Sequence, residues 1–271
     1  MSPIAFRGLE VLALESRRAL EMAELIRKLD GVPFVAPALR EAALADNTEA
    51  LRFAERLLAG EFEMLMLLTG VGTRQLDRLL APRYGEAAFR QALGGLTVAA
   101  RGPKPVAALR EMGIVPALVA PEPNTWRELL AVTEGRPERR IAVQEYGRSN
   151  PELIEALRAR GGEVTTVRIY RYDLPEDLAP LHEAIERLAA GRFGAVLFTT
   201  AQQIVNLMRV AEDRGKAAPV LAALRQTLIG SIGPTTSEAL EEFGLRPALE
   251  PSHPRMGLLV RETAERAADL G

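Results

Sequence analysis

An internal repeat is the feature that most constrains the fold of this chain. Leu67-Leu68-Thr69-Gly70 matches Phe198-Thr199-Thr200-Ala201, and Thr69 aligns with Thr200 at an offset of 131 residues (200 − 69 = 131). The same offset aligns Gly102-Pro103 with Gly233-Pro234, with no insertion between the two matches. One constant offset over so many positions predicts two copies of one supersecondary plan, produced by duplication.

Each copy alternates short apolar segments with longer amphipathic ones. The short segments are rich in branched residues and predict buried strands, at 9–14, 32–36, 64–68 and 96–100 in the first copy and at 141–144, 164–170, 195–198 and 227–232 in the second. The longer segments predict helices with recognisable caps, at 19–29, 48–59, 71–80, 103–112, 151–160 and 235–243. This alternation predicts an α/β protein with parallel sheets that are covered on both faces.

Size and composition suit two such domains in a water-soluble protein. The chain has 271 residues and a net charge of −2, so no basic field attracts nucleic acid or a membrane surface. It has no cysteine and two histidines, which excludes disulfides and thiol nucleophiles and leaves too few histidines for the usual metal site. No apolar run approaches the ~20 residues of a membrane span. The N-terminus has no secretory pattern, and we expect a cytoplasmic location.

Polar turns follow the predicted strands at their carboxyl ends, where parallel sheets bind ligands. Each turn precedes a helix and offers backbone N–H groups to an anion. The six turns are 15–18, 69–74, 101–104, 145–150, 199–203 and 233–237. For any single turn, simple helix capping is the better interpretation. Six turns at the same edge favour a ligand that carries several carboxylates.

Arginines within these turns are candidates for holding a carboxylate, because a guanidinium can pair with it bidentately. Arg17, Arg101 and Arg148 lie in such turns, whereas Arg158 lies beside glutamate on a predicted helix and is interpreted as a solvated charge. The glycines of Gly70-Val71-Gly72 lack the third glycine of a dinucleotide fingerprint, so nucleotide binding has weak support.

Tyr170 belongs to an alternating segment, Val167-Arg168-Ile169-Tyr170-Arg171-Tyr172. Such alternation is typical of an edge strand whose tyrosines pack their rings and keep their hydroxyls in water. The residues alone therefore favour a structural role for Tyr170.

Taken together, several segments resemble the uroporphyrinogen-III synthase family. Each segment is short, but their order and spacing over residues 9–260 are specific; they are 12–17, 69–73, 167–171, 198–200 and 232–236, followed by Ala239-Leu240 and Gly244. The resemblance implies two similar, flavodoxin- or Rossmann-like, three-layer α/β domains joined by two extended linkers. One domain would be discontinuous, formed by residues 1–37 and 175–271, and the other, residues 42–170, would be inserted into it. The linkers would be residues 38–41 and 171–174, and a substrate cleft would lie between the domains.

The resemblance also implies an activity. Hydroxymethylbilane would be cyclised to uroporphyrinogen III, with inversion of ring D and loss of water, as a step toward haem, sirohaem, cobalamin or chlorophyll. The enzyme would be a lyase that needs no metal or redox cofactor. It would act as a monomer, with a transient contact to hydroxymethylbilane synthase as a further expectation.

Site residues follow from the resemblance position by position. Tyr170 matches the tyrosine proposed as general acid in the family, and a reference pKa of ~10 keeps a phenol protonated at neutral pH. The expected substrate-binding residues by resemblance are Arg17, Thr69, Thr200, Thr235 and Thr236, and loop placement adds Arg101 and Arg148. The turn that contains Thr69 departs most from the family pattern.

Two other functions are also compatible with the sequence. Duplicated α/β lobes also occur in non-enzymatic binding proteins for a polyanionic small molecule. A nucleotide-dependent enzyme that uses the glycine-containing turns is the second alternative.

Overall fold

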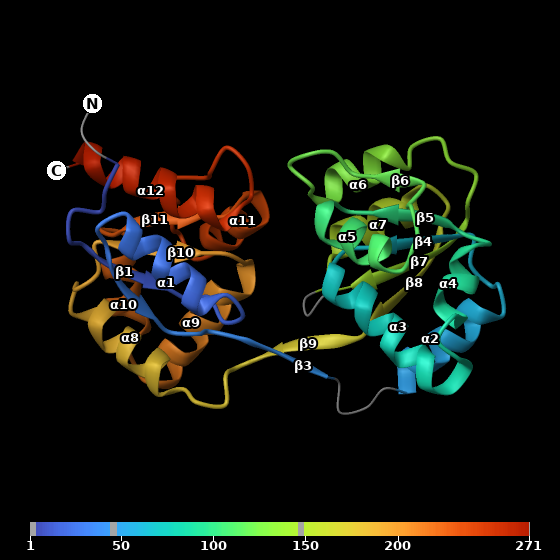
Figure 1. The fold of residues 1–271 in the computed structure, drawn as a ribbon, viewed down its shortest axis with the longest axis horizontal. Coiled ribbons are helices and arrows are strands. Elements are labelled where there is room, and N and C mark those ends of the chain that lie inside the picture. Colours follow the sequence, from blue (N-terminus) through green and yellow to red (C-terminus); the bar gives the residue numbers. More distant parts are fainter. Residues whose placement is uncertain (1–3, 44–47, 146–148, 271) are drawn as a thin grey trace. The chain divides into compact units, whose positions relative to one another are not determined.

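A computed structural model describes residues 4–43, 48–145 and 149–270 (Figure 1). The chain divides into two compact units, which are described separately. Unit 1 comprises Met1–Arg40 and Tyr172–Gly271, and unit 2 comprises Glu41–Arg171. Within the described residues, no helix combines the length and the apolar character that a membrane crossing requires.

Unit 1 is built on a parallel sheet with the strand order β11-β10-β1-β2. The strands are β1 (Glu10–Ala13), β2 (Val32–Val35), β10 (Ala195–Phe198) and β11 (Leu228–Ser231). The helices are α1 (Ala19–Lys28), α8 (Ala179–Ala189), α9 (Ala201–Asp213), α10 (Ala217–Leu224), α11 (Pro234–Glu241) and α12 (Met256–Leu270). Successive residues of a strand point to opposite faces. Leu12 and Leu14 accordingly pack in the core with α8, α9, α10 and α11, whereas Val11 and Ala13 pack in the core with α1 and α12.

Unit 2 has a parallel sheet with the order β6-β5-β4-β7-β8. Its strands are β4 (Met64–Leu67), β5 (Thr97–Ala100), β6 (Leu118–Val119), β7 (Arg140–Glu145) and β8 (Glu163–Arg168). Its helices are α2 (Thr48–Leu58), α3 (Gly70–Tyr84), α4 (Ala88–Leu93), α5 (Pro103–Glu111), α6 (Trp126–Val132) and α7 (Pro151–Ala159). Leu65 and Leu67 face the core formed with α2 to α5, and Met64 and Met66 face the core formed with α6 and α7. Both sheets are covered on both faces, which confirms the α/β class.

A third sheet has two short strands, β3 (Arg40–Ala43) and β9 (Tyr170–Asp173), at the two places where the chain passes between the units (Figure 1). The predicted strand 164–170 is therefore two strands in the structure. Its first part, β8, pairs with β7, and Tyr170 already belongs to β9, which pairs with β3. The change of pairing partner after Arg168 explains why one alternating run forms two elements.

The duplication is visible in the strand register. Met64 pairs with Thr97 in unit 2, and the residues 131 positions further, Ala195 and Leu228, pair in unit 1. The first strands of the two units correspond in the same way, because Val11 pairs with Ala195 just as Ile141 pairs with Met64. Each unit consequently combines the early part of one copy with the late part of the other. Internal duplication is confirmed.

Candidate functional site

The carboxyl ends of parallel strands lie at one edge of each sheet, and the predicted site residues follow those ends. Arg17, Thr200, Thr235 and Thr236 come after β1, β10 and β11 in unit 1, and Thr69 and Arg101 come after β4 and β5 in unit 2. Arg148 lies outside the described residues. The structure therefore groups the described candidates at two edges, one in each unit.

In unit 2, Thr69 is the N-cap residue of α3 and caps the helix with its hydroxyl. Its Oγ1 accepts a hydrogen bond from the N–H of Gly72 at 3.0 Å. The hydroxyl of Tyr170 donates to the same oxygen at 3.1 Å, and Thr69 contacts the Oε1 of Gln144 through its own hydroxyl at 3.4 Å and its N–H at 3.3 Å. Two predicted site residues, 101 positions apart in sequence, are therefore directly bonded.

Tyr170 is buried, with 1% of its surface exposed, and Gln144 beside it is completely buried. The ring of Tyr170 thus packs as the residues alone suggested, while its hydroxyl donates to Thr69. The sequence alone did not indicate Gln144. A polar side chain directly after the apolar run Ile141–Val143 is the signal that could have found it.

Arg101 is half-buried at the end of β5, and its N–H donates to the carbonyl of Leu67 at 3.0 Å. Next to it, Gly102 lies against Asn124, and a Cβ at this glycine would come within 2.7 Å of the amide oxygen of Asn124. The amide nitrogen of Asn124 is buried without a hydrogen-bond partner among the described residues. Asn124 is thus a second polar group at this edge that the sequence did not indicate.

In unit 1, a glutamine organises the turn after β10. The Oε1 of Gln203 accepts the N–H groups of Thr199 at 2.7 Å and Thr200 at 3.3 Å, and its Nε2 donates to the carbonyl of Leu14 at 3.0 Å. The hydroxyl of Thr199 donates to the carboxylate of Glu15 at 2.5 Å. Helix capping is therefore present here: Thr200 is the N-cap residue of α9, and the side chain of Gln203 accepts its N–H.

The two threonines of α11 differ in accessibility. Thr235 is half-buried, whereas Thr236 is 3% exposed and its N–H donates to the carbonyl of Gly233 at 3.0 Å. Arg17 is exposed in the turn after β1. Of these three candidates, Thr235 and Arg17 have the more accessible side chains.

Some cations near the edges already have carboxylate partners. Arg74, in α3 and five residues after Thr69, is bonded bidentately to Glu111 at 2.6 and 2.7 Å. This pairing raises the pKa of Arg74 and lowers that of Glu111. Arg18 is paired with Glu21 in the same way, which raises the pKa of Arg18. Each of these two arginines, which lie within five residues of Thr69 or Arg17, thus already has a carboxylate partner.

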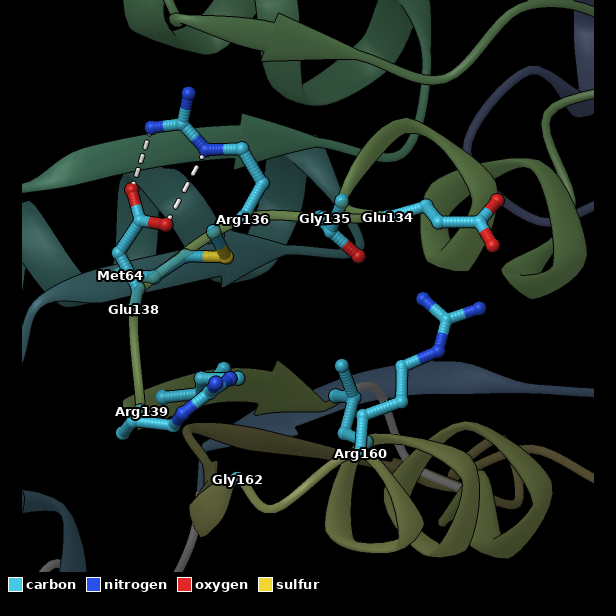
Figure 2. A pocket seen from close by; sticks show the side chains of 11 residues that line it. Met64, Glu134, Gly135, Arg136, Glu138, Arg139, Arg160 and Gly162 are labelled. Atoms are coloured by element: carbon cyan, nitrogen blue, oxygen red, sulfur yellow. Dashed lines mark hydrogen bonds and ion pairs between the residues drawn. The ribbon is translucent and has the colours of Figure 1, made fainter.

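A cavity of about 330 Å³ lies elsewhere in unit 2, near the amino ends of β4 and β7 (Figure 2). Arg136 is bonded bidentately to Glu138 on its wall, and Arg139, Arg160 and Glu134 stand around it. The bonds from Arg136, with one from a threonine hydroxyl, lower the pKa of Glu138 to about 2 despite its burial. None of the predicted site residues that the structure describes lines this cavity.

Known proteins resemble this chain along nearly its whole length. The family model described as "Uroporphyrinogen-III synthase HemD" matches residues 20–261. A Methanothermobacter thermautotrophicus protein named "Putative uroporphyrinogen-III synthase" is 31% identical over 84% of this chain and 87% of its own length. "Uncharacterized protein YjjA" of Bacillus subtilis is 29% identical over 92% of this chain and 93% of its own length.

A solved structure shares the fold as well. The crystal structure of a mutant uroporphyrinogen III synthase from Thermus thermophilus is 26% identical to this chain. The alignment covers 97% of this chain and all of that one, with a TM-score of 0.75. The family model spans both units and the solved structure repeats their fold. The chain belongs to the uroporphyrinogen-III synthase family.

Proposed function

We propose that this chain is a uroporphyrinogen-III synthase, a lyase that converts hydroxymethylbilane into uroporphyrinogen III and water in porphyrin biosynthesis. The observation that carries the proposal is family membership across residues 20–261, combined with the bond between Tyr170 and Thr69 at the carboxyl edge of unit 2. Both residues come from segments that carry the family resemblance.

The substrate is a flexible polyacid, so its binding needs hydrogen-bond donors more than a single strong charge. Helix-initiating turns supply N–H groups, and Thr235 and Thr200 add hydroxyls in unit 1. Arg17, Arg101 and Arg148 would each pair with a carboxylate of the substrate. Thr236 is more deeply buried and its N–H already donates to the carbonyl of Gly233, so its contact with the substrate would require this turn to rearrange.

Catalysis in this proposal begins with Tyr170. Its phenolic proton passes to the hydroxyl of the hydroxymethyl group. The C–O bond then breaks and water departs, and the substrate becomes an electrophilic azafulvene. The substituted carbon of ring D attacks it, the ring rearranges, and the proton that ring closure releases returns to the phenolate, so only water is lost overall. Because Tyr170 is buried, the substrate must first open a path to its hydroxyl, and catalytic hydrogen bonds commonly form only in the complex.

Much of the rate enhancement would come from folding the chain of four pyrroles into the geometry in which the correct carbon is attacked. We further propose that the protein works as a cytoplasmic monomer. Size-exclusion chromatography with light scattering tests the monomer, and a dimer mass would refute it.

The test of the activity is incubation with hydroxymethylbilane that is generated enzymatically in the same tube, followed by chromatographic separation of the type I and type III isomers. The type I isomer forms spontaneously. A type III product that increases with the amount of this protein is expected. If only type I forms while the protein still binds the substrate, the chain is the non-enzymatic polyanion-binding protein that the sequence also allowed.

A further inference from the structure

The side chain of Gln144 determines the direction of the hydrogen bond between Tyr170 and Thr69. Its Nε2 donates to the carbonyl of Glu145, a group that can only accept. Its Oε1 accepts the N–H of Thr69 at 3.3 Å. These two contacts fix which end of the amide faces Thr69, and complete burial of Gln144 keeps water from replacing either one.

This orientation decides the role of the Thr69 hydroxyl. Because the Oε1 of Gln144 cannot donate, the single hydroxyl hydrogen of Thr69 points to Gln144. The oxygen of Thr69 then accepts twice, from the N–H of Gly72 and from the hydroxyl of Tyr170. Tyr170 is therefore the donor in its bond with Thr69 and keeps its proton there.

The other copy of the repeat shows that the fold does not require this arrangement. Gly72 corresponds to Gln203 at the offset of 131, and Gln144 corresponds to Leu14 by strand register. In unit 1 the amide belongs to the helix and bonds to the carbonyl of Leu14. In unit 2 the amide belongs to the strand, and a Cβ on Gly72 would lie 2.1 Å from the Cδ of Gln144.

Each unit thus has one glutamine amide between the turn that precedes α3 or α9 and the neighbouring strand. The glutamine belongs to the helix in unit 1 and to the strand in unit 2. Glutamine on the strand and glycine on the helix occur in the unit whose turn bonds to a tyrosine. Helix capping alone is satisfied by either arrangement. The placement in unit 2 therefore has a cause beyond the stability of the turn.

We propose that Gln144 is a positioning residue for Tyr170, an inference that rests on the proposed function. By taking the hydrogen of Thr69, Gln144 prevents that hydroxyl from donating to the phenol oxygen. A hydrogen bond donated to a phenolate would stabilise it and favour early loss of the proton. Gln144 does not touch the substrate; it keeps the acid protonated and its hydroxyl in a fixed place.

The experiment replaces Gln144 with leucine and compares full kcat and KM profiles against pH. In Gln144→Leu the hydroxyl of Thr69 turns to the phenol oxygen, so the pH above which kcat falls should decrease by about 0.5–1 unit, the effect of one ordinary hydrogen bond. We expect kcat at its optimum to fall about 10-fold and KM to change less than twofold. A kcat profile that keeps its position and height would overturn the proposal.

Two further variants separate positioning from packing. Thr97→Val removes a partly buried hydroxyl bond at the opposite edge of the same sheet, where Thr97 donates to Glu138 at 2.5 Å, and should leave the pH profile unchanged. Gly72→Gln/Gln144→Leu copies the arrangement of unit 1 and should regain the thermal stability that Gln144→Leu loses without regaining the wild-type pH profile. If the double variant restored both, Gln144 would be a packing residue only.

A readout that needs no turnover distinguishes failure of this inference from failure of the proposed function. The chain has four tyrosines, so carbon-13 labelling at Cζ gives four signals, and Tyr170→Phe assigns the one of interest. Gln144→Leu should move the Tyr170 signal. An unmoved signal refutes the positioning role, whether or not the wild type makes the type III isomer, and absence of the type III isomer refutes the proposed function by itself.

Discussion

Replacing Gly72 with alanine tests the packing on which the polar network of unit 2 depends. Gly72 lies in the first turn of α3, and its φ is outside the left-handed region. Alanine is favoured over glycine inside a helix by about 1 kcal/mol, so helix propensity alone predicts a more stable protein. The structure predicts the opposite sign. A Cβ at this position would lie 2.1 Å from both the Cδ and the Nε2 of Gln144.

The size of the destabilisation follows from the packing and the hydrogen bonds that Gln144 would lose. Overpacking costs about 1–3 kcal/mol, and displacing the amide leaves its buried partners unsatisfied, at about 1–3 kcal/mol more. After subtraction of the helix-propensity gain and partial relaxation, we expect Gly72→Ala to destabilise the protein by about 2 kcal/mol. For a chain of this size, that lowers Tm by about 4–8 °C.

Thermal unfolding followed by circular dichroism measures the change. Gly257→Ala is the matched control, because Gly257 also lies in the first turn of a helix, α12, and nothing stands within 4 Å of its added Cβ. The control should be neutral or stabilising. In Gly72→Ala/Gln144→Ala the colliding side chain is gone, and the two substitutions should show a coupling of at least about 1 kcal/mol. A Gly72→Ala protein as stable as the wild type would refute the described packing.

Three further predictions address the site and its surroundings. Tyr170→Phe should lower kcat by about 10²–10⁴-fold with little change in product affinity, measured by isomer chromatography and titration; wild-type turnover would remove Tyr170 as the acid. Arg17→Ala should raise KM about 10-fold and leave kcat nearly unchanged, and an unaltered KM would make Arg17 a surface charge. Glu138 has a folded-state pKa of about 2, below its unfolded value, so its stabilisation is present above pH ~4.5 and is lost as the pH falls toward 2. Glu138→Gln should therefore lower the free energy of unfolding by about 1 kcal/mol at pH 7, a modest amount because Arg136 is partly exposed, and by almost nothing near pH 2. Equal losses of stability at both pH values would contradict this origin.

Local pattern was sufficient to predict most of the strands. The strand 195–198 was predicted with the bounds that the structure has, because an apolar run ends there against Gly194 and Thr199. In contrast, β3 has the sequence Arg-Glu-Ala-Ala, whose composition does not favour a strand, and it was not predicted. Its partner β9 lies about 130 residues away, so pairing over a long distance in sequence decides its conformation.

For the candidate site, too, some features could be predicted from the sequence and others could not. That the candidate residues follow the carboxyl ends of strands could be predicted from strand order alone. Direct contact between Thr69 and Tyr170 could not, because it depends on where the chain goes after β8. Gln144 escaped notice since it follows the apolar run Ile141–Val143 at the end of β7 and its partner is distant in sequence. The roles of these residues in catalysis stay predictions.

The exchange of segments between the two copies has a consequence during synthesis on the ribosome. Strand β1 lies between β10 and β2 in the sheet of unit 1, but β10 begins 160 residues after β2 ends (195 − 35 = 160). At about 5–20 residues per second, the emerging β1-α1-β2 segment waits roughly 8–30 s for its central partner. Unit 2 is contiguous and can fold completely within that interval. The first apolar strand to leave the ribosome is thus among the last to be buried, and a nascent chain arrested before residue 195 should expose it to chaperones.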